Sequence, residues 1–158
     1  MINVLFVCLG NICRSPMADG VLQHMVNEAG LSHLIKVDSA GTGDWHVGER
    51  AHHGTRNVLK QRGIDYAGRA RVFTPEDLDK YDYILAMDSS NLSDIGRIAG
   101  RNYEAEIRRF LAYANDAGLT DVKDVPDPYY SGKFDYVYEL VEIGCRALLD
   151  HIRKEHNM

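Results

Sequence analysis

The fold is decided by one stretch of the chain, Cys8-Leu9-Gly10-Asn11-Ile12-Cys13-Arg14-Ser15. The β-branched and aromatic residues at 2–7 predict a short buried strand that leads into this stretch. Gly10 and Asn11 both tolerate a left-handed backbone, which favours a turn. Ser15-Pro16 is typical of a helix start, with Ser15 as the expected cap and the proline in the first turn. The stretch is therefore predicted to be the loop between a first strand and a first helix.

The rest of the chain continues this alternation. Further strands are predicted at 35–39, 83–87 and 107–113. Helices are predicted at 15–30, 51–62, 90–99 and 137–152. Another helix is predicted to begin at Thr74, with this residue as its cap. The prolines of 124–128 predict a rigid loop. Strands that alternate with helices pair in parallel through right-handed crossovers, so we expect an α/β fold with an open parallel sheet flanked by helices on both faces. Ligands of such sheets bind beyond the carboxyl ends of the strands.

Size and charge narrow the possible functions. The chain has 158 residues with 45% apolar content, so it can bury a core as a single domain spanning residues 1–158. Its 18 Lys and Arg against 23 Asp and Glu give a net charge of -5, which leaves no broad basic surface for nucleic acid. Residues 1–8 lack the basic start of a secretory signal and are too short to cross a bilayer. We therefore expect a cytoplasmic protein that binds neither nucleic acid nor membrane.

The cysteines and histidines favour neither a disulfide framework nor a metal site. Cys8, Cys13 and Cys145 are an odd number without zinc-ligand spacing. His52 and His53 are adjacent and so diverge on a helix, and the remaining histidines show no ligand spacing. In a reducing compartment, such thiols are more often catalytic or simply buried, and no metal is expected.

The predicted loop has the chemistry of an anion site. The expected phosphate-binding residues are Leu9, Gly10, Asn11, Ile12, Cys13, Arg14 and Ser15. Their successive amides and the following helix start form a concave nest for phosphate oxygens, and Arg14 adds a planar fork. The same positive field favours the thiolate form of Cys8 and so makes it a nucleophile. A buried cysteine or a solvated arginine is the usual interpretation of either residue alone, but their spacing at a strand-to-helix junction favours catalysis.

Four elements of the sequence are distinctive when taken together. They are Cys8 to Pro16, Asp38-Ser39-Ala40-Gly41-Thr42, Met87-Asp88 with Ser90-Asn91-Leu92, and Asp127-Pro128-Tyr129-Tyr130. Together they resemble the low-molecular-weight protein tyrosine phosphatases over nearly the whole chain. A cysteine and an arginine at this spacing also occur in unrelated phosphatase families, and the late Asp-Pro-Tyr-Tyr element makes the match specific. The resemblance implies a four-stranded parallel sheet flanked by helices, and catalysis without a metal or an organic cofactor.

The resemblance also implies the catalytic roles. Cys8 matches the nucleophile, Arg14 the phosphate clamp and Asp127 the general acid. The expected reaction is hydrolysis of phosphotyrosine through a cysteinyl-phosphate, with inorganic phosphate as product and inhibitor. Without the resemblance, the alternative interpretation of Asp127 is a turn former next to a proline.

Supporting roles follow from the same resemblance. Ser15 matches a hydroxyl that stabilises the thiolate, and Asn11 and Ser39 match a pair that holds the loop in its strained shape. Cys13 matches a neighbour that protects Cys8 through a reversible disulfide. One departure concerns Gly68, which aligns with a histidine of some relatives, so any support of the loop from that position is in doubt.

Aromatic residues are candidates for the walls of the substrate site. Trp45, Tyr129 and Tyr130 offer flat apolar surfaces that suit a phenyl phosphate. A deep slot favours phosphotyrosine over phosphoserine, so the expected partner is a phosphotyrosine-bearing protein. Trp45 could also anchor its loop, and Tyr130 could be structural. The chain itself is expected to be a monomer or a weak dimer.

Three alternatives remain at this point. A thiol-dependent arsenate reductase on the same scaffold needs further cysteines in the middle of the chain, but 66–100 contain none and Cys145 lies in the last predicted helix. Phosphoarginine phosphatases on this fold carry threonine where this chain has Ile12, and an apolar Ile12 favours a phenyl ring. A non-catalytic phosphate-binding module would leave Cys8 and Asp127 without a purpose.

Overall fold

The computed structural model describes residues 1–100 and 102–158. The strands are β1 Ile2–Cys8, β2 Ile35–Gly41, β3 Tyr83–Ala86 and β4 Glu106–Arg109. The helices are α1 Arg14–Glu28, α2 His53–Gln61, α3 Asp77–Lys80, α4 Ser89–Ala99, α5 Ala112–Asp116, α6 Pro128–Ser131 and α7 Phe134–Glu155. Strands and helices alternate through most of the chain, as the sequence pattern predicts.

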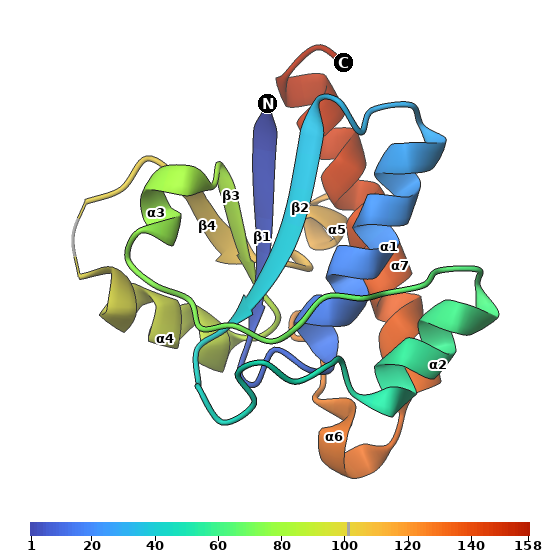
Figure 1. Ribbon diagram of the computed structural model, residues 1–158. Coiled ribbons are helices and arrows are strands. Elements are labelled where there is room, and N and C mark those ends of the chain that lie inside the picture. Colours follow the sequence, from blue (N-terminus) through green and yellow to red (C-terminus); the bar gives the residue numbers. More distant parts are fainter. Residues whose placement is uncertain (101) are drawn as a thin grey trace.

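The four strands form one parallel sheet in the order β2-β1-β3-β4. β1 pairs along its whole length with β2, from Ile2 opposite Ile35 to Cys8 opposite Gly41. Figure 1 shows the strands side by side, with α6 beyond their carboxyl ends. The predicted four-stranded parallel sheet is confirmed. Its order reverses between β1 and β3, which is where open α/β sheets bind their ligands.

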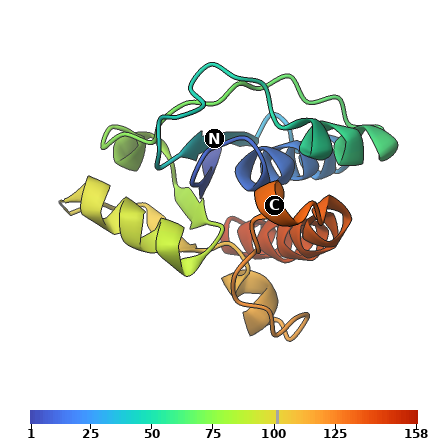
Figure 2. The same ribbon diagram turned by 90° about the horizontal axis from the view of Figure 1, so that it is seen from below.

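Alternate residues of β1 point into the two halves of the core. Val4, Phe6 and Cys8 belong to the larger half, which is completed by α1, α2, α5 and α7. Leu5 and Val7 belong to the smaller half, which is completed by α3 and α4. Figures 1 and 2 show these two groups of helices on opposite faces of the sheet. The β1 strand is therefore buried on both faces, which explains its continuous apolar sequence.

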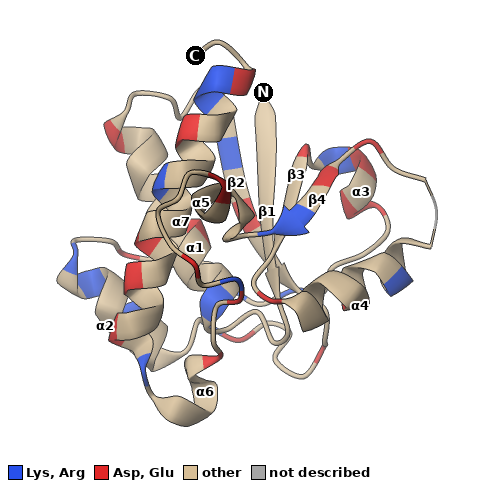
Figure 3. Cartoon of the chain, turned by 180° about the vertical axis from the view of Figure 1, so that it is seen from behind, with Lys and Arg blue, Asp and Glu red and all other residues tan. Residues whose placement is uncertain are grey.

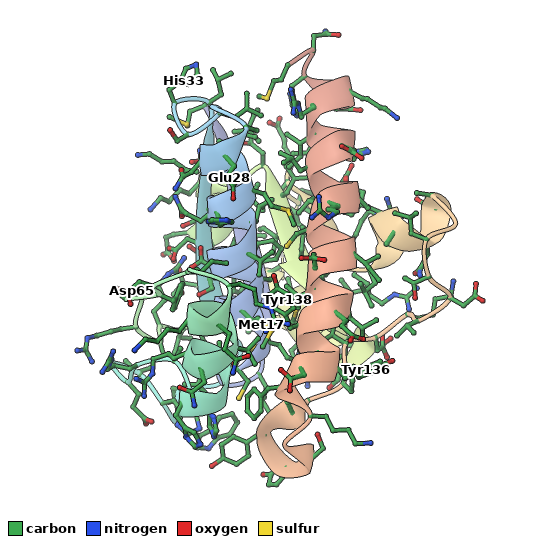
Figure 4. All side chains as sticks on the ribbon, turned by 90° about the vertical axis from the view of Figure 1, so that its right-hand side faces the viewer. Met17, Glu28, His33, Asp65, Tyr136 and Tyr138 are labelled. Atoms are coloured by element: carbon green, nitrogen blue, oxygen red, sulfur yellow. The ribbon has the colours of Figure 1, made fainter. Side chains whose placement is uncertain are left out.

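Helices α1 and α7 carry most of the larger half of the core. Figure 4 shows them side by side, with Met17 of α1 and Tyr138 of α7 labelled near their junction. Met17 is fully buried and Tyr138 nearly so. Cys145 of α7 is also fully buried, and its sulfur lies 3.7 Å from the carbonyl oxygen of Ala18 in α1.

Three predictions of local structure are wrong in detail. Residues 107–113 are not one strand, because β4 ends at Arg109 and Tyr113 already lies in α5. Ser15 does not cap the first helix, which begins at Arg14 and follows Cys13 without a side-chain cap. Thr74 does not cap the third helix either, because its own amide donates to the Asp77 carboxylate. The hydroxyl of Ser15 contacts the sulfur of Cys8 and not a helix amide, and α3 begins after Glu76.

Charged residues of both signs are distributed over the surface. Figure 3 shows acidic and basic segments alternating along α7 and mixed near β4. Among the described residues, no helix combines the length and the apolar content that spanning a bilayer requires.

Two glycines in helices are expected to respond in opposite ways to alanine. A Cβ on Gly144 in α7 would overlap the buried ring of Phe110, so Gly144→Ala should lower the free energy of unfolding by about 1–3 kcal/mol. Nothing lies within 4 Å of a Cβ on Gly96 in α4, so Gly96→Ala should raise it by about 0.5–1 kcal/mol. Urea denaturation of both variants measures the difference. Equal effects of the two substitutions would contradict this account of the packing between α7 and Phe110.

Candidate active site

The loop after β1 curls around the sulfur of Cys8. Asn11 has a left-handed backbone with φ 56°, and its amide donates to Cys8 Sγ at 3.3 Å. The end of β2 passes close behind this loop, where a Cβ on Gly41 would lie 2.9 Å from the Leu9 carbonyl oxygen. Glycine at position 41 therefore permits the close approach of strand and loop.

Ser15 places a hydroxyl beside the same sulfur. Its Oγ lies 3.0 Å from Cys8 Sγ, and both side chains are buried. Ser15 Oγ accepts from Asn11 Nδ2 at 2.8 Å, so its own hydrogen can point at the sulfur. The other acceptor near this hydroxyl, the Ala40 carbonyl, lies farther away at 3.4 Å. This contact occupies the hydroxyl that sequence reasoning assigned to a helix cap.

Arg14 is almost fully buried, and three residues from two segments satisfy its guanidinium. Nη1 donates to Asp88 Oδ2 at 2.5 Å and to the Val125 carbonyl at 3.0 Å. Nη2 lies 3.7 Å from Asp127 Oδ2. Burial opposes the charge, but the Cys8 sulfur and the Asp88 and Asp127 carboxylates together raise the pKa of Arg14 above its ordinary value. Arg14 is therefore a fixed cation next to the sulfur.

Asp127 lies beside Arg14, at the N-cap position of α6. Its Oδ1 accepts from the Tyr129 amide at 3.0 Å, and Pro128 occupies the first turn of the helix. About a third of the Asp127 side chain is exposed to solvent, in contrast to Arg14. The carboxyl group is thus held by its helix while one edge stays open to solvent.

The loop, Arg14 and Asp127 line one cavity of about 390 Å³. Its lining residues are Cys8, Leu9, Gly10, Ile12, Cys13, Arg14, Trp45, His46, Asp127, Tyr129 and Tyr130. The three predicted aromatic walls all belong to it, and all are exposed: Trp45 by 69%, Tyr129 by 45% and Tyr130 by 90%. The rings of Tyr129 and Tyr130 meet edge to face at 4.9 Å. The cavity therefore has a polar floor and an aromatic mouth.

Asn11 and Ser39 are joined behind the loop, as the resemblance implies. Asn11 Nδ2 donates to Ser39 Oγ at 2.9 Å, and Asn11 Oδ1 accepts from the Arg71 amide at 2.9 Å. The amide group of Asn11 thus makes hydrogen bonds with both its nitrogen and its oxygen, and both side chains are buried.

A buried carboxyl group lies farther along the same chain of contacts. Tyr66 Oη is 3.2 Å from Ser39 Oγ and donates to Asp19 Oδ2 at 2.7 Å. Burial, together with the charge of Asp38, raises the pKa of Asp19 to about 7, although the hydroxyl groups of Tyr66 and Ser39 act in the opposite direction. Burial likewise raises the pKa of Tyr66. Asp19 therefore changes charge near neutral pH.

The second cysteine of the loop is a buried thiol. Burial, with the neighbouring Cys8 and Asp127, raises the pKa of Cys13 to about 12, although Arg14 acts in the opposite direction. Cys13 is a free thiol, as are Cys8 and Cys145. Its role in redox protection stays a prediction. Among residues 1–100 and 102–158, no group of His, Cys, Asp or Glu side chains is arranged to hold a metal.

Sequence reasoning gave no role to several residues that shape the site. Asp88 holds Arg14 and also caps α4 through the Asn91 amide, and its position after β3 was the available signal. His46 lines the cavity and its ring lies 6.3 Å from that of Tyr129. His52 accepts from the Gly54 amide at the start of α2, and burial lowers its pKa. No pattern in the sequence indicated a role for His46 or His52 in this site.

Comparisons with known proteins agree on one family. The family profile described as low molecular weight phosphotyrosine protein phosphatase matches residues 3–158. The low molecular weight protein-tyrosine-phosphatase YfkJ of Bacillus subtilis (strain 168) is 46% identical over 159 residues, which cover 100% of both chains. PtpA of Staphylococcus epidermidis, with the same description, is 43% identical over 100% of this chain and 98% of its own.

Solved structures give the same result, and one of them is named for another activity. The crystal structure of YfkJ from Bacillus subtilis matches with a TM-score of 0.93 and 47% identity, over 98% of this chain and 96% of that one. A drosophila arginine phosphatase matches with a TM-score of 0.87 and 32% identity, over 97% and 98% of the two chains.

The buried carboxyl of Asp19 predicts a specific dependence of stability on pH. Because its pKa is raised on folding, its contribution to stability is present below about pH 4 and is lost as the pH rises through about 7. Asp19→Asn removes this titration. The free energy of unfolding of the wild type should therefore fall relative to that of Asp19→Asn by at least about 1 kcal/mol between about pH 5 and about pH 8. Urea denaturation at both pH values measures it, and parallel behaviour of the two proteins would show that Asp19 does not titrate in this range.

Proposed function

The chain belongs to the low molecular weight phosphotyrosine protein phosphatase family, and from this membership we propose that it hydrolyses phosphotyrosine in proteins through a cysteinyl-phosphate on Cys8. The single observation that carries the proposal is the arrangement around that sulfur. A loop amide donates to it, a serine hydroxyl lies beside it, and a buried arginine next to it is 3.7 Å from a partly exposed carboxyl in the same cavity. These are the parts that a phosphoryl transfer needs.

The first half of the reaction transfers the phosphoryl group to sulfur. Cys8 Sγ attacks phosphorus in line, so that an S–P bond forms as the P–O bond to the tyrosine ring breaks. Arg14 and the loop amides stabilise the charge on the equatorial oxygens. Asp127 gives its proton to the departing phenolate oxygen. Ser15 donates to the sulfur before and after it carries the phosphoryl group.

The second half releases phosphate. Asp127, now ionised, takes a proton from water as the water oxygen attacks phosphorus, and the S–P bond breaks. Phosphate and the Cys8 thiolate result, so the cycle closes without a redox partner or a metal. Inorganic phosphate fits the same loop and is expected to inhibit as a product.

Aromatic substrates fit the cavity better than short aliphatic ones. A phenyl phosphate has a flat ring that Trp45 and Tyr129 can sandwich while its phosphorus reaches Cys8. We therefore expect phosphotyrosine to be hydrolysed far faster than phosphoserine. The cytoplasm is the proposed location, because the three cysteines are all free and a reducing compartment keeps them so.

Two substitutions test the mechanism together. Cys8→Ser should abolish hydrolysis, because a serine hydroxyl is a poor nucleophile at neutral pH. Asp127→Asn keeps an acceptor for the Tyr129 amide but cannot supply a proton, so kcat should fall by about 10²–10⁴-fold on aryl phosphates with poor leaving groups. Substrates with good leaving groups should lose much less. Steady-state kinetics on a series of aryl phosphates measures this, and an equal loss along the series would remove Asp127 as the general acid.

The related arginine phosphatase makes phosphoarginine the second candidate substrate. Ile12 decides between them in our interpretation, because it lines the cavity and packs with Ala70 and Phe134. Ile12→Thr should shift the ratio of kcat/KM for phosphotyrosine to that for phosphoarginine by at least about tenfold toward phosphoarginine. Ile12→Val is the matched control, because valine has the shape of threonine without the hydroxyl. A wild type that prefers phosphoarginine would overturn the proposed substrate.

A further inference from the structure

A line of hydrogen bonds runs from Asn11, at the back of the loop, to the buried carboxyl of Asp19. Its donors can be put in order. Asn11 Oδ1 accepts from the Arg71 amide, which fixes the orientation of the side-chain amide. Both hydrogens of Asn11 Nδ2 are then available, one for Ser15 Oγ and one for Ser39 Oγ. Asn11 thus donates toward the catalytic sulfur through Ser15 and away from it through Ser39.

The branch through Ser39 ends at the buried carboxyl of Asp19. Tyr66 has one hydroxyl hydrogen, which it gives to Asp19 Oδ2 at 2.7 Å. Its oxygen, 3.2 Å from Ser39 Oγ, can accept the hydrogen of Ser39. The order of donors is therefore Asn11, Ser39, Tyr66, with Asp19 as the final acceptor.

The line of hydrogen bonds ends on α1, the helix that also carries Arg14 and Ser15. Ser15 and Asp19 are four residues apart in α1 and so lie on the same face of it. One branch from Asn11 ends at Ser15, and the other ends at Asp19, one turn later in α1. In between they connect β2, through Ser39, and the segment after α2, through Tyr66.

We propose that Tyr66 and Asp19 are positioning residues, which hold Asn11 in its left-handed conformation and so aim the Ser15 hydroxyl and the Asn11 amide at the catalytic sulfur. This inference rests on the proposed function of Cys8. Neither residue touches the substrate cavity, so they act only through Ser39 and Asn11.

The backbone around Tyr66 is shaped to place its hydroxyl. Gly68 lies two residues later, and a Cβ there would be 2.5 Å from Tyr66 Oη. The missing side chain of Gly68 is thus the space that the hydroxyl occupies. Figure 4 shows the neighbouring Asp65 on the segment that leaves α2 and runs beside α1.

The Asp19 carboxyl is a costly group to bury, and packing gives no reason for it. It is 6% exposed, and burial raises its pKa strongly. The titratable groups that face it are Tyr66, Asp38 of β2 and Cys145 of α7, none of which is a cation. The hydrogen bond that its carboxylate accepts comes from the hydroxyl of Tyr66, the last donor in the line of hydrogen bonds. A role as final acceptor accounts for a carboxyl group at this position.

The test removes the hydroxyl of Tyr66 and measures kcat and the affinity of the loop for inorganic phosphate. Tyr66→Phe should lower kcat about tenfold and weaken the binding of inorganic phosphate several-fold, because the loop loses its fixed geometry. Calorimetric titration with phosphate needs no turnover. If the wild type bound phosphate but did not hydrolyse phosphotyrosine, the proposed function would fail while this comparison could still be made.

A matched tyrosine separates positioning from general stability. Tyr113 also donates its hydroxyl to a carboxylate, that of Glu106, at the end of the sheet where the strands begin. Tyr113→Phe should lower stability to a similar degree but leave kcat and phosphate affinity unchanged. If both variants lose activity equally, or if Tyr66→Phe keeps the wild-type kcat and phosphate affinity, the inference is overturned.

A second variant displaces the hydroxyl without removing it. Gly68→Ala puts a Cβ into the space of Tyr66 Oη, and it should reproduce the losses of Tyr66→Phe. In the Ser39→Ala background, where the line is already broken, neither substitution should add a further loss. Gly96→Ala is the matched control and should have no effect on kcat. Full additivity of Gly68→Ala or Tyr66→Phe with Ser39→Ala would count against a connected line, and Gly68→Ala decides the question if Tyr66→Phe does not fold.

Discussion

The burial of one guanidinium is the constraint that organises this structure. A cation taken out of water must meet opposite charge and hydrogen-bond acceptors, or it destabilises the fold by several kcal/mol. Arg14 meets Asp88 after β3, and the Val125 carbonyl and the Asp127 carboxyl of the loop before α6. The strand order brings these parts to one edge of the sheet, so the topology supplies the partners that the buried charge requires. The buried guanidinium of Arg14 is thereby held as a fixed cation beside the Cys8 sulfur.

The loop around Cys8 contains a second constraint, because Asn11 has a left-handed backbone, which is strained at a residue other than glycine. Asn11 tolerates this conformation better than most residues, and its side chain is held by hydrogen bonds in three directions. The same bonds orient the hydroxyl next to the sulfur. Backbone strain and catalytic geometry are therefore maintained by one set of contacts, and the proposed roles of Tyr66 and Asp19 extend that set to a carboxyl buried within α1.

The parts of the structure that the sequence predicted are those with local signals. The apolar run of β1, the turn at Gly10 and Asn11, and the prolines after Asp124 each act over a few residues. The pairing of Arg14 with Asp88 and that of Tyr66 with Asp19 join residues far apart in the chain, and no periodicity reports them. The prediction of one strand over 107–113 was wrong because periodicity cannot separate a short strand from a short helix, and here β4 is followed within three residues by α5.

The distribution of the site along the chain has a consequence for its synthesis. The nucleophile is residue 8, whereas Asp88, Val125 and Asp127 follow much later, and α7 must still dock on α1. A ribosome that makes about 5–20 residues per second therefore exposes the cysteine for several seconds before its partners exist. During that interval the nascent chain carries a thiol without its electrostatic surroundings. The site is complete only when the last quarter of the polypeptide has emerged, so a prematurely terminated product lacks Asp127 and α7 and is expected to be inactive.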